Sequence, residues 1–343
     1  MTGTTVNGSG TGARSGAQTL LLLAAPLNMA ILRALAERPL PQADLQSEVG
    51  APAQSTLRTQ LKRLAEIGAL EKRRRDRFPG ALEYELTASG EELLCVADVL
   101  AHWLEHAPQG PLESGSGGAR ATVKAFAEGW SSTMLRALAA GPLSLTELDA
   151  VIGAFSYPAL DRRLAALRLC GLVEANAAKA RGTPYAVTEW LRRAVAPLLG
   201  AARWECRHLA PPTTPAGRVD IEATLLLAAP LLHGPPDLSG SVRLAAEIPG
   251  GNDSCLAGAT IELTVGRVAA CSTRLRIDVD GWATGSLDAW LSAVIEDERG
   301  GLELGGKPHL ADTVLRSLHD TLFATVVQEG VDAWLSIREY RSN

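Results

Sequence analysis

Two segments of the sequence, 103 residues apart, carry the same pattern, and this repeat constrains the fold more than any other feature. Residues 31–45 read ILRALAERPLPQADL, and residues 134–148 read MLRALAAGPLSLTEL. The match continues through a pattern of spaced leucines as far as Gly68 in the first segment and Gly171 in the second. Self-similarity at a fixed offset is the signature of repeated domains. The repeat therefore predicts two tandem copies of one domain.

The offset falls to 101 after residue 80, which aligns Tyr84 with Tyr185 and Trp103 with Trp204. A deletion of two residues in an exposed turn explains the change, because surface loops tolerate differences in length.

Residues 55–77 of the first copy combine an amphipathic pattern with a dense run of cations. Leucines at positions 57, 61 and 64 share one helical face, while Arg58 and Lys62 share another. Such a concentration of cations in a chain of net charge −5 indicates a polyanionic partner. The alternative is a solvated hairpin tip that has no partner. The cations of this run are Arg58, Lys62, Arg63, Lys72, Arg73, Arg74, Arg75 and Arg77.

The segment after this helix predicts a basic β-hairpin. Residues 69–73 and 81–86 have the character of strands, and Pro79 and Gly80 lie in the turn between them. A winged helix-turn-helix needs this combination, with a helix for the major groove of DNA and a wing for the backbone or the minor groove.

The motifs ILRAL, PL, L-x3-L-x2-L and YELTASG, followed by a helix that ends near Trp103, resemble the HxlR-type winged helix-turn-helix regulators. The resemblance covers both copies, although the second has Leu191 where the first has Gly90. Because that family binds DNA as homodimers, the resemblance implies double-stranded DNA as a partner and a covalent pseudo-dimer of the two copies. Further pairing of whole chains into a homodimer stays open.

Apolar residues surround more than one face of the helix expected over residues 93–104. This helix is therefore expected to bury a second side against another domain. Capping the core of its own domain is the alternative.

The two copies differ in the chemistry of the third helix. Where the first copy has Arg58, Thr59, Gln60, Lys62 and Arg63, the second has Asp161, Arg162, Arg163, Ala165 and Ala166. We expect asymmetric recognition, with most of the electrostatic contribution from the first copy, because a carboxylate near phosphates weakens binding.

Ser55 is expected to be the N-cap of the third helix in the first copy, and Ser156, followed by Pro158, its counterpart in the second. The candidate DNA-contacting residues are Ser55, Thr56, Arg58, Thr59, Lys62, Arg63, Arg73, Arg74, Arg75 and Arg77 in the first copy, and Tyr157, Arg162, Arg163, Lys179 and Arg181 in the second.

The last third of the chain has a different character. Short strand-like runs are expected at residues 221–225, 242–248, 261–265 and 275–279, followed by a break at DGWATGS, a helix LDAWLSAVI with Ser286 as N-cap, a strand GGLELGG and a helix over residues 309–323. This order, over residues 219–326, resembles the sterol-carrier-protein-2-like fold, which implies an apolar cavity. The candidate cavity residues are Trp282, Trp290, Leu291, Leu318 and Phe323, and filling of a two-layer core is the alternative for each.

The predicted fold class is a multidomain chain with two tandem winged helix-turn-helix domains, mostly α with a β-hairpin wing, and a C-terminal α+β domain. Residues 217–343 carry 18 acids and 10 bases, so a polyanion is expected to bind the first two thirds and to be repelled by the last. The expected division is a disordered tail (1–17), winged helix domain 1 (18–107), a flexible linker (108–120), winged helix domain 2 (121–209), a Pro-rich linker (210–218) and an α+β ligand-binding domain (219–343).

The sequence contains no complete catalytic or cofactor-binding motif. The five cysteines lack CxxC spacing, and the G-x4-G-K match at residues 301–307 is followed by Pro308 where a phosphate-binding loop needs Ser or Thr. His102 and His106 have the spacing of a helical metal pair, but they lie at a helix end beside a linker. We therefore expect no enzyme activity, no cofactor, no metal and no membrane association, and a cytoplasmic location.

Two functions are consistent with these sequence features. The favoured one is a transcriptional regulator whose C-terminal domain binds a small apolar ligand and alters the affinity for DNA. The alternative is a protein that sequesters or carries a small molecule and uses the winged helices as a dimerisation scaffold.

Overall fold

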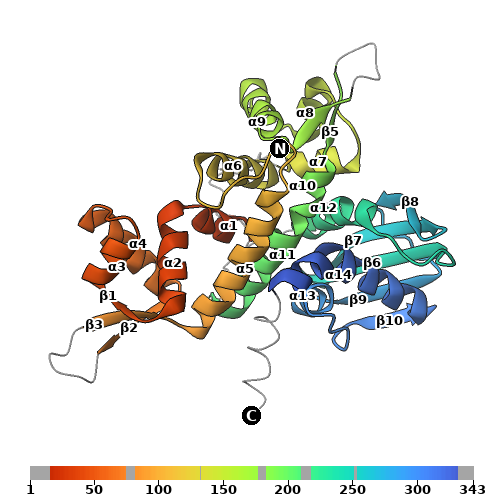
Figure 1. Ribbon diagram of the computed structural model, residues 1–343. Helices are drawn as coiled ribbons and strands as arrows, with labels where there is room; N and C mark the ends of the chain where they lie inside the picture. Colours follow the sequence, from red (N-terminus) through yellow and green to blue (C-terminus); the bar gives the residue numbers. More distant parts are fainter. Residues whose placement is uncertain are drawn as a thin grey trace.

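The computed structural model describes residues 16–74, 82–131, 133–176, 183–209, 218–250 and 253–330. Two long helices, α5 (Ala88–Glu105) and α11 (Val195–His208), pack against each other at its centre. Three units project from this pair, as Figure 1 shows.

The first unit combines helices with a small antiparallel sheet of order β1-β3-β2. Its helix α4 packs inward through Leu57, Leu61 and Leu64, each at most 1% exposed, as their spacing predicts. The elements before α5 are α1 (Ala17–Leu23), α2 (Pro26–Glu37), β1 (Leu40–Pro41), α3 (Gln42–Glu48), α4 (Gln54–Glu66), β2 (Leu70–Arg74) and β3 (Leu82–Leu86).

The second unit repeats this order with two differences: an isolated bridge at Leu143 stands in place of β1, and two consecutive helices, α10 and α11, stand in place of α5. Ser144 and Glu147 form a capping box at the start of α8, so each satisfies a free amide of the other. The elements before α11 are α6 (Gly117–Ser131), α7 (Met134–Ala140), α8 (Leu145–Ile152), α9 (Tyr157–Leu169), β4 (Val173–Ala175), β5 (Tyr185–Val187) and α10 (Glu189–Arg193).

Specific contacts recur in these two units at the offsets of the sequence repeat. Thr87 caps α5 by accepting a hydrogen bond from the amide of residue 90, and Thr188 caps α10 in the same way with the amide of residue 191. Leu40 pairs with Tyr84, and Leu143 pairs with Tyr185. The aligned residues therefore make the same contacts within each unit.

The contact between the two units is also reciprocal. The indole N–H of Trp103 donates to the carbonyl oxygen of Trp190 at 2.9 Å, and that of Trp204 donates to the carbonyl oxygen of Ser89 at 2.7 Å. Each donor and each acceptor is related to its counterpart by the offset of 101 residues. Helices α1 and α6 also pack against each other beside this contact. Burial of a second face of α5, predicted from its apolar residues, is confirmed by its packing against α11.

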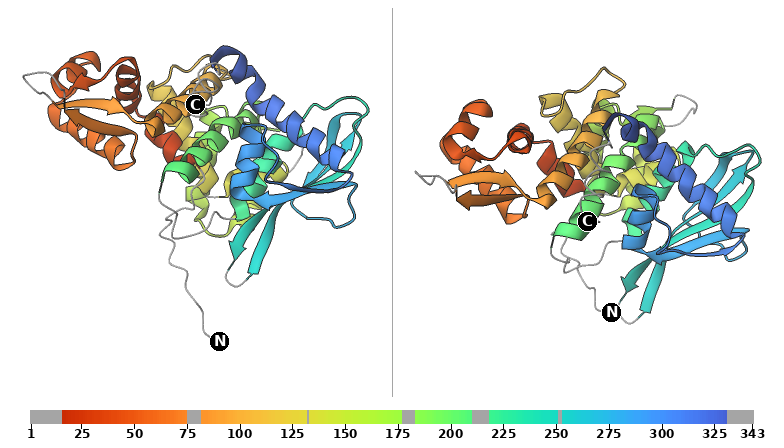
Figure 2. Two further views of the ribbon diagram at one scale, coloured as in Figure 1. Left: turned by 90° about the horizontal axis from the view of Figure 1, so that it is seen from below. Right: turned by 60° about the horizontal axis from the view of Figure 1, so that its bottom comes forward.

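The third unit is α+β, with a five-stranded sheet of order β10-β9-β6-β7-β8. Strands β6 and β9 are parallel, and the other neighbouring strands are antiparallel. Helices α12, α13 and α14 lie against the sheet, as the views in Figure 2 show. The elements are α12 (Arg218–Ala228), the 3-10 helix η1 (Ala229–Leu231), β6 (Gly240–Gly250), β7 (Asp253–Thr264), β8 (Arg267–Ser272), β9 (Gly281–Ser286), α13 (Leu287–Ile295), β10 (Glu303–Gly306) and α14 (Pro308–Gly330).

Three predictions about elements of the third unit are wrong. Residues 221–225 belong to helix α12, not to a strand, because Ile221, Thr224, Leu225 and Ala228 turn one helical face inward. Residues 275–279 form a loop in which Ile277 is 89% exposed, and the alternation of apolar residues there does not reflect burial. The break expected at DGWATGS, residues 280–286, is instead strand β9 from Gly281 to Ser286, and β8 was not predicted.

The segments expected to be a tail and a flexible linker are partly folded. Ala17 begins α1 and is buried, and the amide of Gly16 donates to Glu205 at 3.2 Å. In the linker, the amide of Leu112 donates to the carbonyl oxygen of Leu104, and α6 already begins at Gly117. Residues 1–15 and 210–217 lie outside the described part.

The predicted caps of the two third helices have different outcomes. Helix α4 has Ala53 at its N-cap, so the prediction of Ser55 is wrong. Ser156 is the N-cap of α9 with a proline in the first turn, as predicted, although its side chain makes no capping hydrogen bond.

No single helix among the described residues is long and apolar enough to cross a membrane. The bent pair α1 and α2, with an angle of 77° between them, reaches that length and apolarity only together.

Candidate nucleic-acid interface and apolar cavity

Helix α4 presents a basic face to solvent. Its leucines fix the opposite face in the core, so the polar positions point outward. The predicted contact residues on this helix are all exposed; they are Ser55, Thr56, Arg58, Thr59, Lys62 and Arg63. Within the described part, Lys62 pairs with Glu66 at 3.6 Å, and both side chains are well exposed. An exposed pair of this kind is weak, so Lys62 can exchange it for a phosphate.

Strand β2 continues this basic surface next to α4. Lys72, Arg73 and Arg74 are exposed, and Arg73 lies 3.6 Å from Glu85 on β3. The ammonium group of Lys72 lies 5.3 Å from the ring centroid of Tyr84. Arg75 and Arg77, also predicted to contact DNA, lie outside the described residues.

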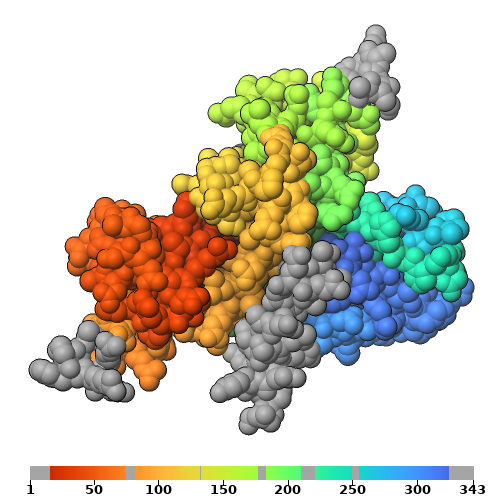
Figure 3. All heavy atoms as spheres, in the orientation of Figure 1, coloured from red at the N-terminus to blue at the C-terminus, as the bar shows by residue number. Residues whose placement is uncertain are grey.

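This surface lies on the far side of the molecule from the acidic third unit. Figure 1 shows α4 and the β1–β3 sheet in one lobe, with α5 and α11 between them and the β6–β10 sheet. The space-filling view in Figure 3 shows the same separation between the first and third units. The described part of the basic face is therefore accessible to a large polyanion.

The corresponding surface of the second unit is less basic. Arg162 is exposed on α9, but the guanidinium group of Arg163 stacks on the ring of Phe155 at 4.1 Å. Tyr157 is 48% exposed, and Asp161 is exposed next to it. Lys179 and Arg181, which were predicted to contact DNA from the second wing, lie outside the described residues.

Several cations of the second unit bind the third unit instead of facing outward. Arg136 donates twice to Glu222, from Nε at 3.1 Å and from Nη2 at 2.5 Å. The guanidinium of Arg203 is buried and contacts Asp288 and Ser292 on α13 and Glu296 at the C-cap of this helix. The cations before residue 217 were expected to bind a polyanion. For Arg136 and Arg203 this expectation is wrong, because carboxylates of the third unit already neutralise them.

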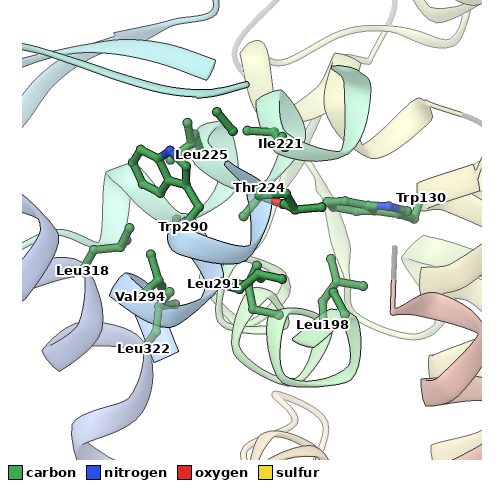
Figure 4. Close-up of a pocket in the computed structure, with 15 residues that line it drawn as sticks. Trp130, Leu198, Ile221, Thr224, Leu225, Trp290, Leu291, Val294, Leu318 and Leu322 are labelled. Carbon is green, nitrogen blue, oxygen red and sulfur yellow. The ribbon is translucent and has the colours of Figure 1, made fainter. Parts of the chain in front are cut away.

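An apolar cavity of ≈ 70 Å³ lies where the second and third units meet. Figure 4 shows Trp130 from α6 and Trp290 from α13 on different sides of this cavity, with Leu198 from α11 nearby. The remaining lining residues come from α11, α12, β6, α13 and α14; they are Leu199, Ala202, Ile221, Thr224, Leu225, Ala228, Ala246, Leu287, Leu291, Val294, Leu318 and Leu322.

Three of the five predicted cavity residues, Trp290, Leu291 and Leu318, line this cavity. Trp282 does not, because it pairs with Arg243 in the sheet and so points to the face opposite Ala246; the Arg243 guanidinium lies 5.6 Å from its ring centroid. Phe323 is buried beside His319 at a ring distance of 6.1 Å. Trp130 and Leu198 also line the cavity but were not predicted, because they belong to the second unit.

The described residues contain no group of three or more His, Cys, Asp or Glu side chains that could hold a metal ion. The rings of His102 and His106 lie near the end of α5 with their centroids 4.5 Å apart and their planes tilted by 50°.

An exposed basic helix beside an antiparallel strand pair, built on a short helical core, defines the class of the first unit as a winged helix-turn-helix. Residues 22–109 match the family HxlR-like helix-turn-helix, and this match covers nearly all of the first unit. A comparison with curated proteins gives no match to the chain.

Proposed function

We propose that the protein is a DNA-binding transcriptional regulator in which the first unit provides most of the contact with DNA. The observation that carries this proposal is the exposed basic face of α4 and β2 within the segment that matches the HxlR-like family. Helix α4 is the candidate for the major groove, and the hairpin is the candidate for the backbone. Regulation requires binding alone, so the proposal includes no catalytic step, cofactor or metal.

We further propose that the second unit is another winged helix and that the two form a covalent pseudo-dimer. The repeated element order and the reciprocal hydrogen bonds of Trp103 and Trp204 support this reading. A symmetric dimer makes every contact twice, once in each direction. A pair of contacts related by one offset is what a fused dimer would retain.

We also propose that a small apolar molecule modulates DNA binding through the third unit, whose sterol-carrier-protein-2-like character stays a prediction. The cavity at the border of this unit supports ligand binding. It also fits the alternative function, a carrier or sequestering protein, so DNA binding has to decide between the two.

A salt titration with a labelled duplex tests the regulator. The logarithm of the binding constant should fall steeply with the logarithm of the salt concentration, because counterions are released from the DNA. Arg74→Ala, on the proposed interface, should reduce this slope by about 0.9. Arg316→Ala removes an exposed arginine with the same charge from α14 and should leave the slope unchanged. A flat wild-type slope, or equal effects of the two variants, would favour the carrier.

A further inference from the structure

The apolar cavity belongs to two units at once. Trp130 on α6 and Leu198 on α11 come from the second unit, whereas Trp290, Leu291 and Leu318 come from the third. We propose that this cavity is an effector site for a small uncharged aromatic molecule, and that its occupancy changes how the second unit is held. This inference rests on the proposed regulator function and specifies where and by what it is controlled.

The lining determines the chemical class of the ligand. None of the lining residues carries a charge, and the walls are almost wholly hydrocarbon and indole. The indole N–H of Trp290 is already donated to the carbonyl oxygen of Ala245 at 2.8 Å, so it is not available to a ligand. A charged ligand would lose its hydration without gaining a partner. An aromatic ring gains favourable edge or offset contacts with the two tryptophans.

The size of the cavity limits the ligand further. At ≈ 70 Å³ the cavity is far smaller than the several hundred Å³ typical of pockets for drug-sized molecules. A single ring is therefore the largest ligand that fits, and even a ring needs the lining side chains to move, because an apolar cavity that holds benzene measures about 150 Å³. Ala202, Ile221 and Thr224 are only partly buried, which places the entrance between α11 and α12.

A short path of packed residues connects the cavity with α9. Trp130 follows Gly129 on α6, and a β-carbon at Gly129 would lie 3.2 Å from Cδ2 of Leu167 on α9. Helix α6 is therefore fitted closely against the helix that corresponds to α4. On the other side, the ion pair of Arg136 with Glu222 ties α7 to α12, which also lines the cavity. A ring that displaces Trp130 would move α6 and α9 relative to the third unit.

The first experiment measures binding with fluorobenzene as the probe and 4-fluorobenzoate as its charged counterpart. In ¹⁹F NMR spectra with the full-length protein, the signal of fluorobenzene should broaden and that of 4-fluorobenzoate should not. Ala202→Leu fills the entrance and should abolish the broadening, whereas Ala202→Ser keeps the volume and should preserve it. If Ala202→Leu does not fold, as judged by its melting curve, Thr224→Leu serves the same purpose. Absence of broadening in the wild type, or broadening that persists in a folded filled variant, would overturn the proposal.

The second experiment measures the affinity for a DNA duplex with and without saturating fluorobenzene. The dissociation constant of the wild type should change by about fivefold or more, the usual lower range of coupling between sites, and that of Ala202→Leu should not change. Binding of fluorobenzene without any change in DNA affinity would refute the effector role. A protein that binds fluorobenzene but has no salt-dependent affinity for DNA would instead refute the regulator function and leave the ligand site standing.

Discussion

Helices α4 and α9 differ in the surroundings of individual side chains. Arg163 stacks on Phe155, a position at which the first unit has Pro52, so no aromatic ring draws a side chain inward there. A cation–π contact of this kind stabilises the arginine by about 0.5–2 kcal/mol. Arg163 must give up this contact with Phe155 to bind a phosphate, so its contribution to DNA binding is reduced. The cations of α4 remain exposed to solvent.

Arg58→Ala should therefore weaken DNA binding and reduce the salt slope by about 0.9, because one contact with a phosphate is lost. Ala165→Lys adds a cation at the position in α9 that corresponds to Lys62, and it should change the affinity less. Fluorescence anisotropy with the same duplex measures both variants. Equal and opposite effects would argue against an asymmetric role for the two units.

The cysteines differ in their exposure, which leads to a second prediction. Burial raises the pKa of the Cys95 thiol to about 12 and that of the Cys271 thiol to about 11, and it also raises the pKa of Cys170. At pH 8 these thiols stay protonated and should react slowly, whereas the exposed Cys206 and Cys255 should react quickly. Titration of the native protein with a disulfide reagent should show two fast thiols, and Cys206→Ser with Cys255→Ser should show none. A third fast thiol in the native protein would contradict the burial described for the other cysteines.

At the scale of elements, the third unit is joined to α11 by buried charge. The side chains of Arg203 and Glu296 are 8% and 9% exposed, and Arg207 also donates to Glu296 at 2.5 Å. Removing one partner of a buried pair leaves the other charge uncompensated.

Arg203→Met should lower the free energy of unfolding by about 3 kcal/mol, because Asp288 loses Arg203 and the buried Glu296 keeps only Arg207, whose side chain is partly exposed. The control is Arg193→Met, which removes an exposed pair with Glu189 that is worth at most about 1 kcal/mol. Urea denaturation followed by circular dichroism measures both. Similar losses in the two variants would show that the buried pair has no special weight.

The sequence predicted elements well where a single periodicity decides the structure. Helix α4 and the burial of its leucines followed from their spacing, and α13 with its cap at Ser286 followed from the pattern around LDAWLSAVI. Short apolar runs failed, because five residues such as 221–225 fit a strand or a helix until the surrounding contacts are known. Trp282 failed for a related reason, since its side of the sheet depends on the register with β6.

Of the two candidate sites, the cavity was predicted only in part, because its lining comes from two units. The basic face of α4 is local in sequence and was therefore predictable from residues 55–74. The cavity joins residues as distant as Trp130 and Leu322, and nothing in either segment indicates that they meet. The pairing of Arg136 and Arg203 with acids of the third unit was not predicted either, although residues 109–216 carry 12 bases and 8 acids and residues 217–343 carry 10 bases and 18 acids.

At the scale of the whole molecule, the facing surfaces of α5 and α11 are already occupied within the chain. Helices α5 and α11 bury each other, and the indole rings of Trp103 and Trp190 stack at 4.7 Å. A second chain cannot use the same surface without unfolding this contact.

We therefore expect one chain per duplex. Light scattering after gel filtration should give the mass of a monomer for the free protein, 36.1 kDa, and that mass plus one duplex for the complex. A free protein of twice that mass would show that the chains pair through another surface.

The reciprocal tryptophan contact has a consequence for how such a molecule can diversify. In an assembly of two identical subunits every substitution appears twice, so an acidic module that docks on one α11 would have to dock on its twin as well. Fusion removes this constraint: α11 holds α13 of the third unit through Arg203, whereas α5, its counterpart, packs against α14 of the same unit. One half of the chain can thus specialise in carrying a sensor while the other keeps its basic face.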